Sequence, residues 1–220
     1  KPGMTILEVQ PGAQSWWTEI LAPYAQRTGG KFYVTGPDLS NPELPEGARK
    51  SRAAFEARYG AKPDLYGKID VVNWGAKSAP LPKDTFDFIL TARSVHGWMG
   101  QPGMAEKTFK EFYDALKPGG ILALEQHRAN PGPQDPKAPT GYVTEDHVIE
   151  MAKQAGFTLA AKSELNANPK DTKDHPFGVW TLPPMLRSTA YGSEKDTDPT
   201  FDHSKYVAIG ESDRMTLKFV

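Results

Sequence analysis

Short apolar runs and longer amphipathic segments alternate along the chain. Runs rich in apolar residues, bounded by Gly, Pro or polar clusters, predict strands at 6–9, 31–35, 69–73, 86–91, 121–125, 157–164 and 215–220. Between them, apolar residues recur at helical spacing over 15–27, 45–59, 104–116 and 144–156. Strands that alternate with helices in this way predict an α/β fold, Rossmann-like, with a parallel sheet and right-handed crossovers.

The first corner between a strand and a helix carries candidate chemistry. The strand ends at Glu8-Val9, and the chain then passes through Pro11-Gly12 to Ser15, which we expect to cap the following helix. In an open α/β sheet such a corner brings backbone N–H groups to the edge where ligands bind. Only Gly12 stands where a dinucleotide-binding turn has three glycines. The corner indicates either a nucleotide-type cofactor pocket or an ordinary buried strand, turn and helix.

Further candidate cofactor ligands follow the second and third strands. Asp38 comes after Gly36-Pro37, and a carboxylate there can accept two hydrogen bonds from a ribose diol, although Asp after Pro is also an ordinary turn residue. Trp74-Gly75-Ala76 follows the third strand, where the residues can flank an adenine ring or, in the case of Trp74, form core.

Titratable residues follow the fourth and fifth strands. Arg93 and His96 lie on the predicted loop after the fourth strand, and Glu125, His127 and Arg128 lie at the end of the fifth. Because the carboxyl ends of parallel strands share one edge, we expect these side chains to gather there. A histidine in such a place serves either as a proton acceptor or as a brace that fixes a loop by hydrogen bonds.

Composition narrows the choice of partners. The 26 Lys and Arg residues nearly balance the 27 Asp and Glu residues, which argues against a broad nucleic-acid surface. No apolar run approaches the roughly 20 residues that span a bilayer. The chain opens at Lys1-Pro2-Gly3 almost on its first strand, so we expect that upstream residues were removed or lie outside this sequence. The absence of cysteine excludes disulfides and a catalytic thiol.

The segment from 165 to about 204 is polar and too long for an ordinary connection. We expect it to be a long loop or cover between the last two strands, or a contact in a possible homodimer. The remaining pattern is consistent with a single domain over 1–220.

Three motifs in order resemble the class I S-adenosylmethionine-dependent methyltransferases. They are Ile6-Leu7-Glu8-Val9-x-Pro11-Gly12, Leu81-Pro82 followed by Phe86-Asp87-Phe88-Ile89-Leu90, and Leu116-Lys117-Pro118-Gly119-Gly120-Ile121-Leu122. The resemblance implies a seven-stranded, mostly parallel sheet with helices on both faces and an antiparallel last strand. Further stretches, among them Ser94–Met99 and Gly178–Pro184, resemble a bacterial group of uncharacterised predicted methyltransferases that are often exported. A periplasmic location follows from that resemblance alone, with a cytoplasmic one as the alternative.

The resemblance also implies roles for individual residues. Glu8 would shape the first turn, Gly12 would let the backbone approach the amino-acid end of S-adenosylmethionine, and Asp38 would hold the ribose. Trp74, Gly75 and Ala76 would lie near the adenine, and we expect Arg93 to contact the cofactor as well. Gln10 and Gln14 replace the outer glycines of the usual turn, which puts cofactor affinity in question.

Methyl transfer to oxygen or nitrogen needs an aligned acceptor and a base. His96 is our first choice for the base and His127 the second, while Tyr142 would orient the acceptor. The segment Ala92–Val95 lacks the Asp/Asn-Pro-Pro-aromatic motif of amino-methylating nucleic-acid enzymes, which favours a small-molecule acceptor. Histidine spacing predicts no metal site. A non-catalytic binding protein and an NAD-dependent oxidoreductase remain alternatives.

Overall fold

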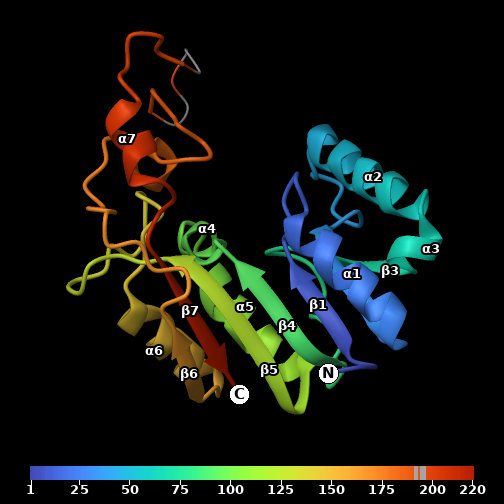
Figure 1. The fold of residues 1–220 in the computed structure, drawn as a ribbon. Coiled ribbons are helices and arrows are strands. Elements are labelled where there is room, and N and C mark those ends of the chain that lie inside the picture. Colours follow the sequence, from blue (N-terminus) through green and yellow to red (C-terminus); the bar gives the residue numbers. More distant parts are fainter. Residues whose placement is uncertain (191–192, 194–196) are drawn as a thin grey trace. The chain divides into compact units, whose positions relative to one another are not determined.

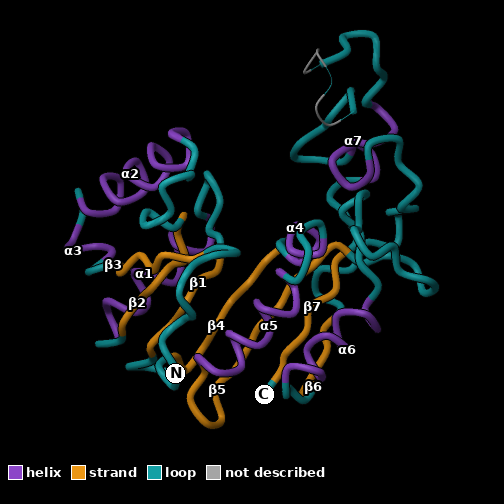
Figure 2. Tube along the Cα trace, turned by 180° about the vertical axis from the view of Figure 1, so that it is seen from behind, coloured by secondary structure: helices purple, strands orange, loops and turns teal. Residues whose placement is uncertain are grey.

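The computed structural model describes residues 1–190, 193 and 197–220. Strands and helices alternate along most of the described chain (Figures 1 and 2). The strands are β1 (Thr5–Val9), β2 (Lys31–Pro37), β3 (Ile69–Trp74), β4 (Phe86–Ala92), β5 (Leu116–His127), β6 (Leu159–Ser163) and β7 (Arg214–Phe219). The helices are α1 (Trp16–Thr28), α2 (Glu46–Gly60), α3 (Pro63–Tyr66), α4 (Val95–Met99), α5 (Met104–Ala115), α6 (Glu145–Ala155), the 3-10 helix η1 (Gly178–Thr181) and α7 (Ser204–Ile209).

The seven strands form one sheet in the order β3-β2-β1-β4-β5-β7-β6. β1 pairs in parallel with both β2 and β4, and β2 pairs in parallel with β3. The last strand of the sequence, β7, lies between β5 and β6 and runs antiparallel in an otherwise mostly parallel sheet (Figure 1). The prediction of a Rossmann-like α/β fold is therefore confirmed.

The chain divides into two compact units. The first contains residues 1–92, 107–123 and 219–220, and the second contains residues 93–106 and 124–218. In the first unit, apolar side chains of β1 and β2 pack with those of α1, α2 and α3, and Ile6, Phe32, Val34, Tyr59 and Tyr66 are buried there. None of the described helices is both long and apolar enough to cross a membrane.

Two helix starts differ from the sequence-based prediction. Ser15 does not cap α1 through its side chain; its backbone is left-handed, and its hydroxyl donates to the carbonyl of Gly12 at 3.0 Å. Thr144, at the start of α6, also makes no capping hydrogen bond through its side chain. Residue preference at an N-cap is statistical, and here the preceding turn fixes the Ser15 hydroxyl in another direction.

Two other segments also differ. Residues 95–99, expected as loop, form α4, in which Val95, Trp98 and Met99 are buried at the three- and four-residue spacing of a helix face. β5 begins at Leu116 rather than at 121. Backbone N–H groups of Asp84 and Thr85 donate to the carbonyls of Asp114 and Ala115, so the chain is already paired where α5 ends.

The polar segment 165–204 contains η1 and is anchored by the buried carboxylate of Asp171 in the second unit. That carboxylate accepts hydrogen bonds from the Tyr142 hydroxyl and from the backbone N–H groups of Lys173 and Asp213. The expectation of a long cover extends over residues 191–192 and 194–196, which lie outside the described residues.

Asp87 joins three strand starts in the first unit. Its Oδ2 accepts the backbone N–H of Thr5 at 2.7 Å and contacts Lys117 Nζ at 2.8 Å. The same carboxylate therefore connects the beginnings of β1, β4 and β5. The Phe86-Asp87 and Lys117-Pro118 motifs meet here, on the strand starts rather than at the ligand-binding edge.

Glu8 is a second, more deeply buried carboxyl group of the first unit. It is 3% exposed, and the hydroxyl of Thr18 in α1 donates to its Oε2 at 2.5 Å. Burial raises the pKa of Glu8 to about 7, and the hydrogen bond from Thr18 opposes part of that rise. Glu8 thus supports the first turn from beneath and titrates near neutral pH.

Replacing Asp87 by Ala should lower the free energy of unfolding by about 1–3 kcal/mol, because the half-buried N–H of Thr5 loses a charged acceptor. Lys117→Ala should cost only about 0–1 kcal/mol, since an exposed pair contributes little. Urea denaturation measures both, with Asp64→Ala, an exposed aspartate of α3, as the matched control. Equal losses for Asp87→Ala and Asp64→Ala would contradict this role.

Glu8→Gln should change how stability depends on pH. Because the pKa of Glu8 rises from 4.5 to about 7 on folding, its protonation stabilises the native state fully below pH 4.5, and this stabilisation is lost as pH rises through 7. Relative to the parent, the Gln variant should gain about 3 kcal/mol between pH 4.5 and pH 8. Urea unfolding across this range measures the difference, with Glu106→Gln, on an exposed position, as the matched substitution. A constant difference between parent and Glu8→Gln would contradict the assignment.

Candidate functional site

A cavity of about 630 Å³ opens in the first unit. Its walls come from four parts of the sequence: the turn after β1, the end of β2, α2, and β3. Cavities of roughly 300–1,000 Å³ accommodate cofactor-sized ligands. Apolar and aromatic side chains form much of the lining, including Val34, Phe55, Val71 and Trp74.

The turn after β1 has an unusual backbone. Gln10, Gly12 and Ser15 all have positive φ angles, of 52°, 68° and 52°. The N–H of Gln10 donates to Thr35 Oγ1 at 2.8 Å, which ties the turn to β2. The left-handed conformations for which glycine is preferred are thus held here by two residues with side chains.

Gly12 presents an open side of this turn to the cavity that it lines. A Cβ atom built at Gly12 would meet no atom within 4 Å. A ligand can therefore approach the backbone closely at this position.

Trp74 forms part of the cavity wall and is held in place from behind. Its Nε1 donates to Glu111 Oε2 at 3.0 Å, and its ring stacks on Phe112. Glu111 in turn pairs with Lys107 at 2.5 Å. The neighbours Gly75 and Ala76 do not line the cavity, and the carbonyl of Gly75 accepts from Lys107 Nζ at 3.1 Å.

Asp38 and Glu8 lie beside the cavity rather than in its lining. Asp38 is 8% exposed, and its Oδ1 accepts the N–H of Ser40 at 3.0 Å and the hydroxyl of Ser40 at 2.6 Å. No hydrogen bond to the other oxygen, Oδ2, is found within the described part of the chain. The carboxyl group of Glu8 accepts a hydrogen bond from the Thr18 hydroxyl.

Arg52 is a cavity residue that the sequence analysis missed. Its guanidinium donates to the carbonyls of Pro37 and Val71 and to Asn73, and it pairs with Glu56 at 2.9 Å. It thereby fixes the ends of β2 and β3 where they line the cavity. The only sequence signal was a basic residue within a helix that has few large apolar residues, a pattern that also describes a solvated face.

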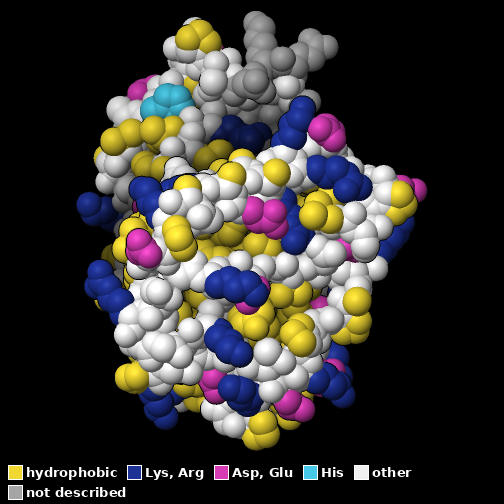
Figure 3. Space-filling view, turned by 90° about the vertical axis from the view of Figure 1, so that its right-hand side faces the viewer, with side chains coloured by type: hydrophobic (Ala, Val, Ile, Leu, Met, Phe, Trp, Pro, Cys, Tyr) yellow, Lys and Arg dark blue, Asp and Glu magenta, His cyan; other side chains and the backbone are white. Residues whose placement is uncertain are grey.

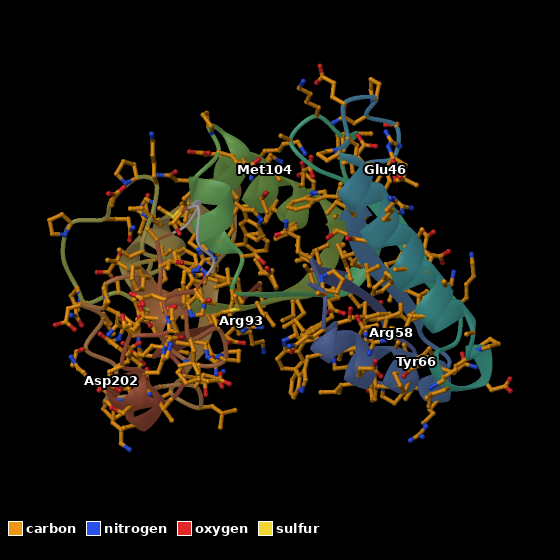
Figure 4. The ribbon with its side chains drawn as sticks, turned by 90° about the horizontal axis from the view of Figure 1, so that it is seen from above. Glu46, Arg58, Tyr66, Arg93, Met104 and Asp202 are labelled. Atoms are coloured by element: carbon orange, nitrogen blue, oxygen red, sulfur yellow. The ribbon has the colours of Figure 1, made fainter. Side chains whose placement is uncertain are left out.

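A second bracing contact lies between the helices of the same unit. Arg58 and Tyr66 (Figure 4) both contact the carboxylate of Glu19 in α1, at 2.5 Å each, and the Tyr59 hydroxyl contacts it at 3.0 Å. Arg58 lines the cavity, so this contact links the wall of the cavity to α1.

The second unit contains the remaining candidates. The rings of His96 and His127 lie 5.7 Å apart, and Trp180 packs edge-on against His96 at the same distance. Burial lowers the pKa of His96 and, more strongly, that of His127, with Arg93 adding to both effects. Both imidazoles are therefore neutral at physiological pH.

Arg93 lies between the end of β4 and the start of α4 (Figure 4). Its backbone is left-handed, with φ at 56°, and its N–H donates to the carbonyl of Glu125 at 2.8 Å. A non-glycine residue in this region is uncommon, and such positions are concentrated at functional sites.

Tyr142 is buried next to His127, but its hydroxyl is already engaged. It lies 3.0 Å from both oxygens of Asp171, which also contacts His175 Nε2 at 2.9 Å. Burial and the Asp171 charge raise the pKa of Tyr142 well above its usual range. In this arrangement the Tyr142 hydroxyl donates a hydrogen bond to the buried carboxylate of Asp171.

The sequence profile of the methyltransferase-domain family matches residues 9–124, a little over half of the chain. A demethylmenaquinone methyltransferase from Lysinibacillus sphaericus is 26% identical over 125 residues, which are 56% of this chain and 44% of that protein. The chain therefore spans less than half the length of that curated relative.

Solved structures share the fold. An S-adenosylmethionine-dependent methyltransferase from Aquifex aeolicus has 22% identity and a TM-score of 0.52, covering 74% of this chain and 77% of its own. One from Methanosarcina mazei has 15% identity and a TM-score of 0.55, covering 100% and 92%. The [4+2]-cyclase SpnF has 18% identity and a TM-score of 0.60, covering 100% and 75%.

The three motifs of the sequence, the seven-stranded sheet and the family match agree. The chain belongs to the methyltransferase-domain family of class I, whose cofactor is S-adenosylmethionine.

Proposed function

We propose that the chain transfers a methyl group from S-adenosylmethionine to a small molecule, with the cofactor held in the cavity of the first unit. The observation that carries this proposal is the left-handed turn at Gln10, Gly12 and Ser15, whose open side lines a cavity of suitable size. The cofactor supplies an electrophilic methyl group on a sulfonium centre. The chain's own residues bind the cofactor, orient the methyl acceptor and take its proton.

In this proposal, three residues hold the cofactor. Gly12 admits the ligand to the backbone of the turn, and Trp74, fixed by Glu111, offers its ring to the adenine. Asp38 takes the ribose hydroxyls through Oδ2, because Ser40 occupies Oδ1. Glu8 supports the turn without touching the ligand, and Arg52 keeps the ends of β2 and β3 in position.

His96 is the proposed base of the second unit. Its pKa lies below the ordinary value, so the imidazole is ready to accept a proton at neutral pH. No partner for its Nε2 is found among the residues that the structure describes. Tyr142 packs against His127 in this scheme and takes no part in proton transfer, because its hydroxyl donates a hydrogen bond to Asp171.

A small-molecule acceptor is supported by charge. The chain has a formal net charge of −1, and on the face shown in Figure 3 basic and acidic side chains are interspersed. The demethylmenaquinone methyltransferase that resembles the chain is named for a small-molecule acceptor. The resemblance to exported bacterial methyltransferases supports a periplasmic location.

Cofactor binding tests the first step of this proposal. S-adenosylhomocysteine should raise the thermal midpoint of the parent, because a ligand that binds only the native state stabilises it. Gly12→Ala should bind it at least tenfold more weakly, since the new Cβ would take open space at a cavity-lining position and is strained at a positive φ. Gly29→Ala, with a φ of 71° and no atom within 4 Å of the built Cβ, provides the matched control. It should lose similar stability and keep its affinity.

Titration calorimetry gives the affinities, with NAD as the comparison ligand. No binding of S-adenosylhomocysteine to the parent at millimolar concentration would sink the proposal. Tighter binding of NAD would replace it by an oxidoreductase function.

Transfer itself can be followed with S-adenosylmethionine that carries an isotopically labelled methyl group and a low-molecular-mass metabolite extract. The parent should move label into the small-molecule fraction, and His96→Ala should slow this by about 10²–10⁴-fold, as expected for loss of a general base. His147→Ala, on the half-buried side of α6, controls for the loss of an imidazole. If His96→Ala and His147→Ala transfer label equally fast, His96 is not the base.

A further inference from the structure

The lining of the cavity in the first unit carries charge of one sign. Arg52 and Arg58 are cationic, and none of the lining residues that the structure describes is acidic. A cavity lined in this way favours an anionic group of its ligand. In S-adenosylmethionine the sulfonium and ammonium centres are positive, and the carboxylate of the amino-acid end is the one anionic group. That carboxylate is therefore the part of the cofactor that an arginine of the lining can bind.

The two arginines differ in the donors that they have left. Arg52 uses its guanidinium on two backbone carbonyls and on the side chains of Asn73 and Glu56. Arg58 donates to Glu19 through Nη2 at 2.5 Å, and no acceptor for its Nε or Nη1 is found among the described residues. Its side chain lines the cavity and is 49% exposed. Because a guanidinium has five N–H groups in a planar fork, Arg58 keeps donors for a carboxylate.

Glu19 fixes Arg58 and needs only part of its fork. The two oxygens of Glu19 also accept the hydroxyls of Tyr59, at 3.0 Å, and Tyr66, at 2.5 Å. The hydrogen bond from Tyr66 lowers the pKa of Glu19, so this carboxylate stays ionised and continues to attract the guanidinium. Arg58 thus reaches from α2 to α1 with its position set by a satisfied carboxylate (Figure 4).

These contacts place Arg58 near the turn after β1. Glu19 lies one helical turn after Ser15, and its N–H donates to the Ser15 carbonyl at 3.2 Å. Burial raises the pKa of Tyr59 to about 12, and a hydrogen bond from the side chain of Ser15 opposes part of that rise, so Ser15 lies beside the Tyr59 hydroxyl. Ser15 lines the cavity together with Gly12. The guanidinium is therefore close to the turn that would meet the amino-acid end of the cofactor.

The turn offers further donors. The backbone N–H groups of Gly12 and Ala13, which both line the cavity, make no hydrogen bond within the described part of the chain. Successive N–H groups in turns with left-handed residues form concavities that bind anions. A carboxylate has about four lone-pair sites on its two oxygens, enough to accept from the turn and from an arginine together.

We propose that Arg58, together with the backbone at Gly12 and Ala13, binds the carboxylate at the amino-acid end of S-adenosylmethionine. Glu19 is a positioning residue, because it acts through Arg58. This inference rests on the proposed cofactor site and adds to it a residue of α2, a helix in which the sequence analysis predicted no site residue.

Two ligands test this role by binding alone. S-adenosylhomocysteine and 5′-methylthioadenosine share the adenosine and the thioether sulfur, but only the first has an amino-acid end. In titration calorimetry with the full chain, Arg58→Ala should bind S-adenosylhomocysteine about 10–100-fold more weakly, the range for a lost hydrogen bond to a charged group. It should bind 5′-methylthioadenosine as the parent does. Arg58→Lys should recover part of the loss, because lysine keeps the charge without the planar fork.

Two control variants separate carboxylate binding from bracing of the helices. Tyr66→Phe removes another hydrogen bond to Glu19, and Lys50→Ala removes an exposed cation of α2 that pairs with Glu46. Both should bind each ligand as the parent does. A loss in Tyr66→Phe as large as that in Arg58→Ala would overturn the assignment, because bracing would then explain the effect.

The outcomes for Arg58→Ala are equally decisive. An equal loss for both ligands would overturn carboxylate binding, and an unchanged affinity for S-adenosylhomocysteine would do so too, leaving Arg58 to an anionic methyl acceptor. A parent that binds neither ligand would overturn the proposed function along with this inference. A parent that binds S-adenosylhomocysteine no more tightly than 5′-methylthioadenosine would overturn this inference alone.

Discussion

The left-handed backbone between β1 and α1 is the constraint on which the cavity of the first unit depends. Gln10, Gly12 and Ser15 occupy conformations in which residues with side chains are strained, and local contacts hold them there. Gln10 is tied to Thr35 on β2, Ser15 bonds back to Gly12, and Glu8 bonds to Thr18 beneath the turn. Of the two glutamines that replace glycines of the usual turn, Gln10 thus adopts a left-handed conformation and Gln14 does not. Hydrogen bonds to Thr35 and Gly12 hold Gln10 and Ser15 in backbone conformations that a glycine adopts without such support.

Motifs that resemble a family can have structural rather than chemical roles. Asp87 and Lys117 pair at the strand starts of the first unit, where Asp87 also takes the N–H of Thr5. Aspartate has a low propensity for β-strands, so we attribute the contribution of Asp87 to the connection it makes between strands that are distant in sequence. The motifs identify the fold because they hold the sheet together, and the ligand-binding edge is free to vary.

Hydrophobic periodicity was enough to predict the sheet and most helices, because burial of one face imposes a spacing that is visible locally. It failed at two short local features. The hydroxyl of Ser15 donates a hydrogen bond to the carbonyl of Gly12 instead of capping α1. The segment that forms α4 was predicted as loop, although Val95, Trp98 and Met99 have helical spacing. For the site, Gly12 and Trp74 line the cavity, whereas Glu8, Asp38, Gly75 and Ala76 lie outside the lining, and the cofactor contacts of all six stay predictions. The bracing role of Arg52 depends on carbonyls of β2 and β3, which no local pattern reveals.

In the second unit, hydrogen bonding decides which side chain is free to take a proton. Asp171 is buried and accepts from Tyr142, His175 and two backbone N–H groups, so its lone pairs are fully used. Removing the proton of Tyr142 would place a second negative charge beside that carboxylate, at a cost that burial increases. His96 and His127 have no such neighbour, and burial keeps them neutral. In the proposed function, proton transfer in this unit is therefore assigned to the histidines, while Tyr142 and Asp171 anchor the polar segment that follows α6.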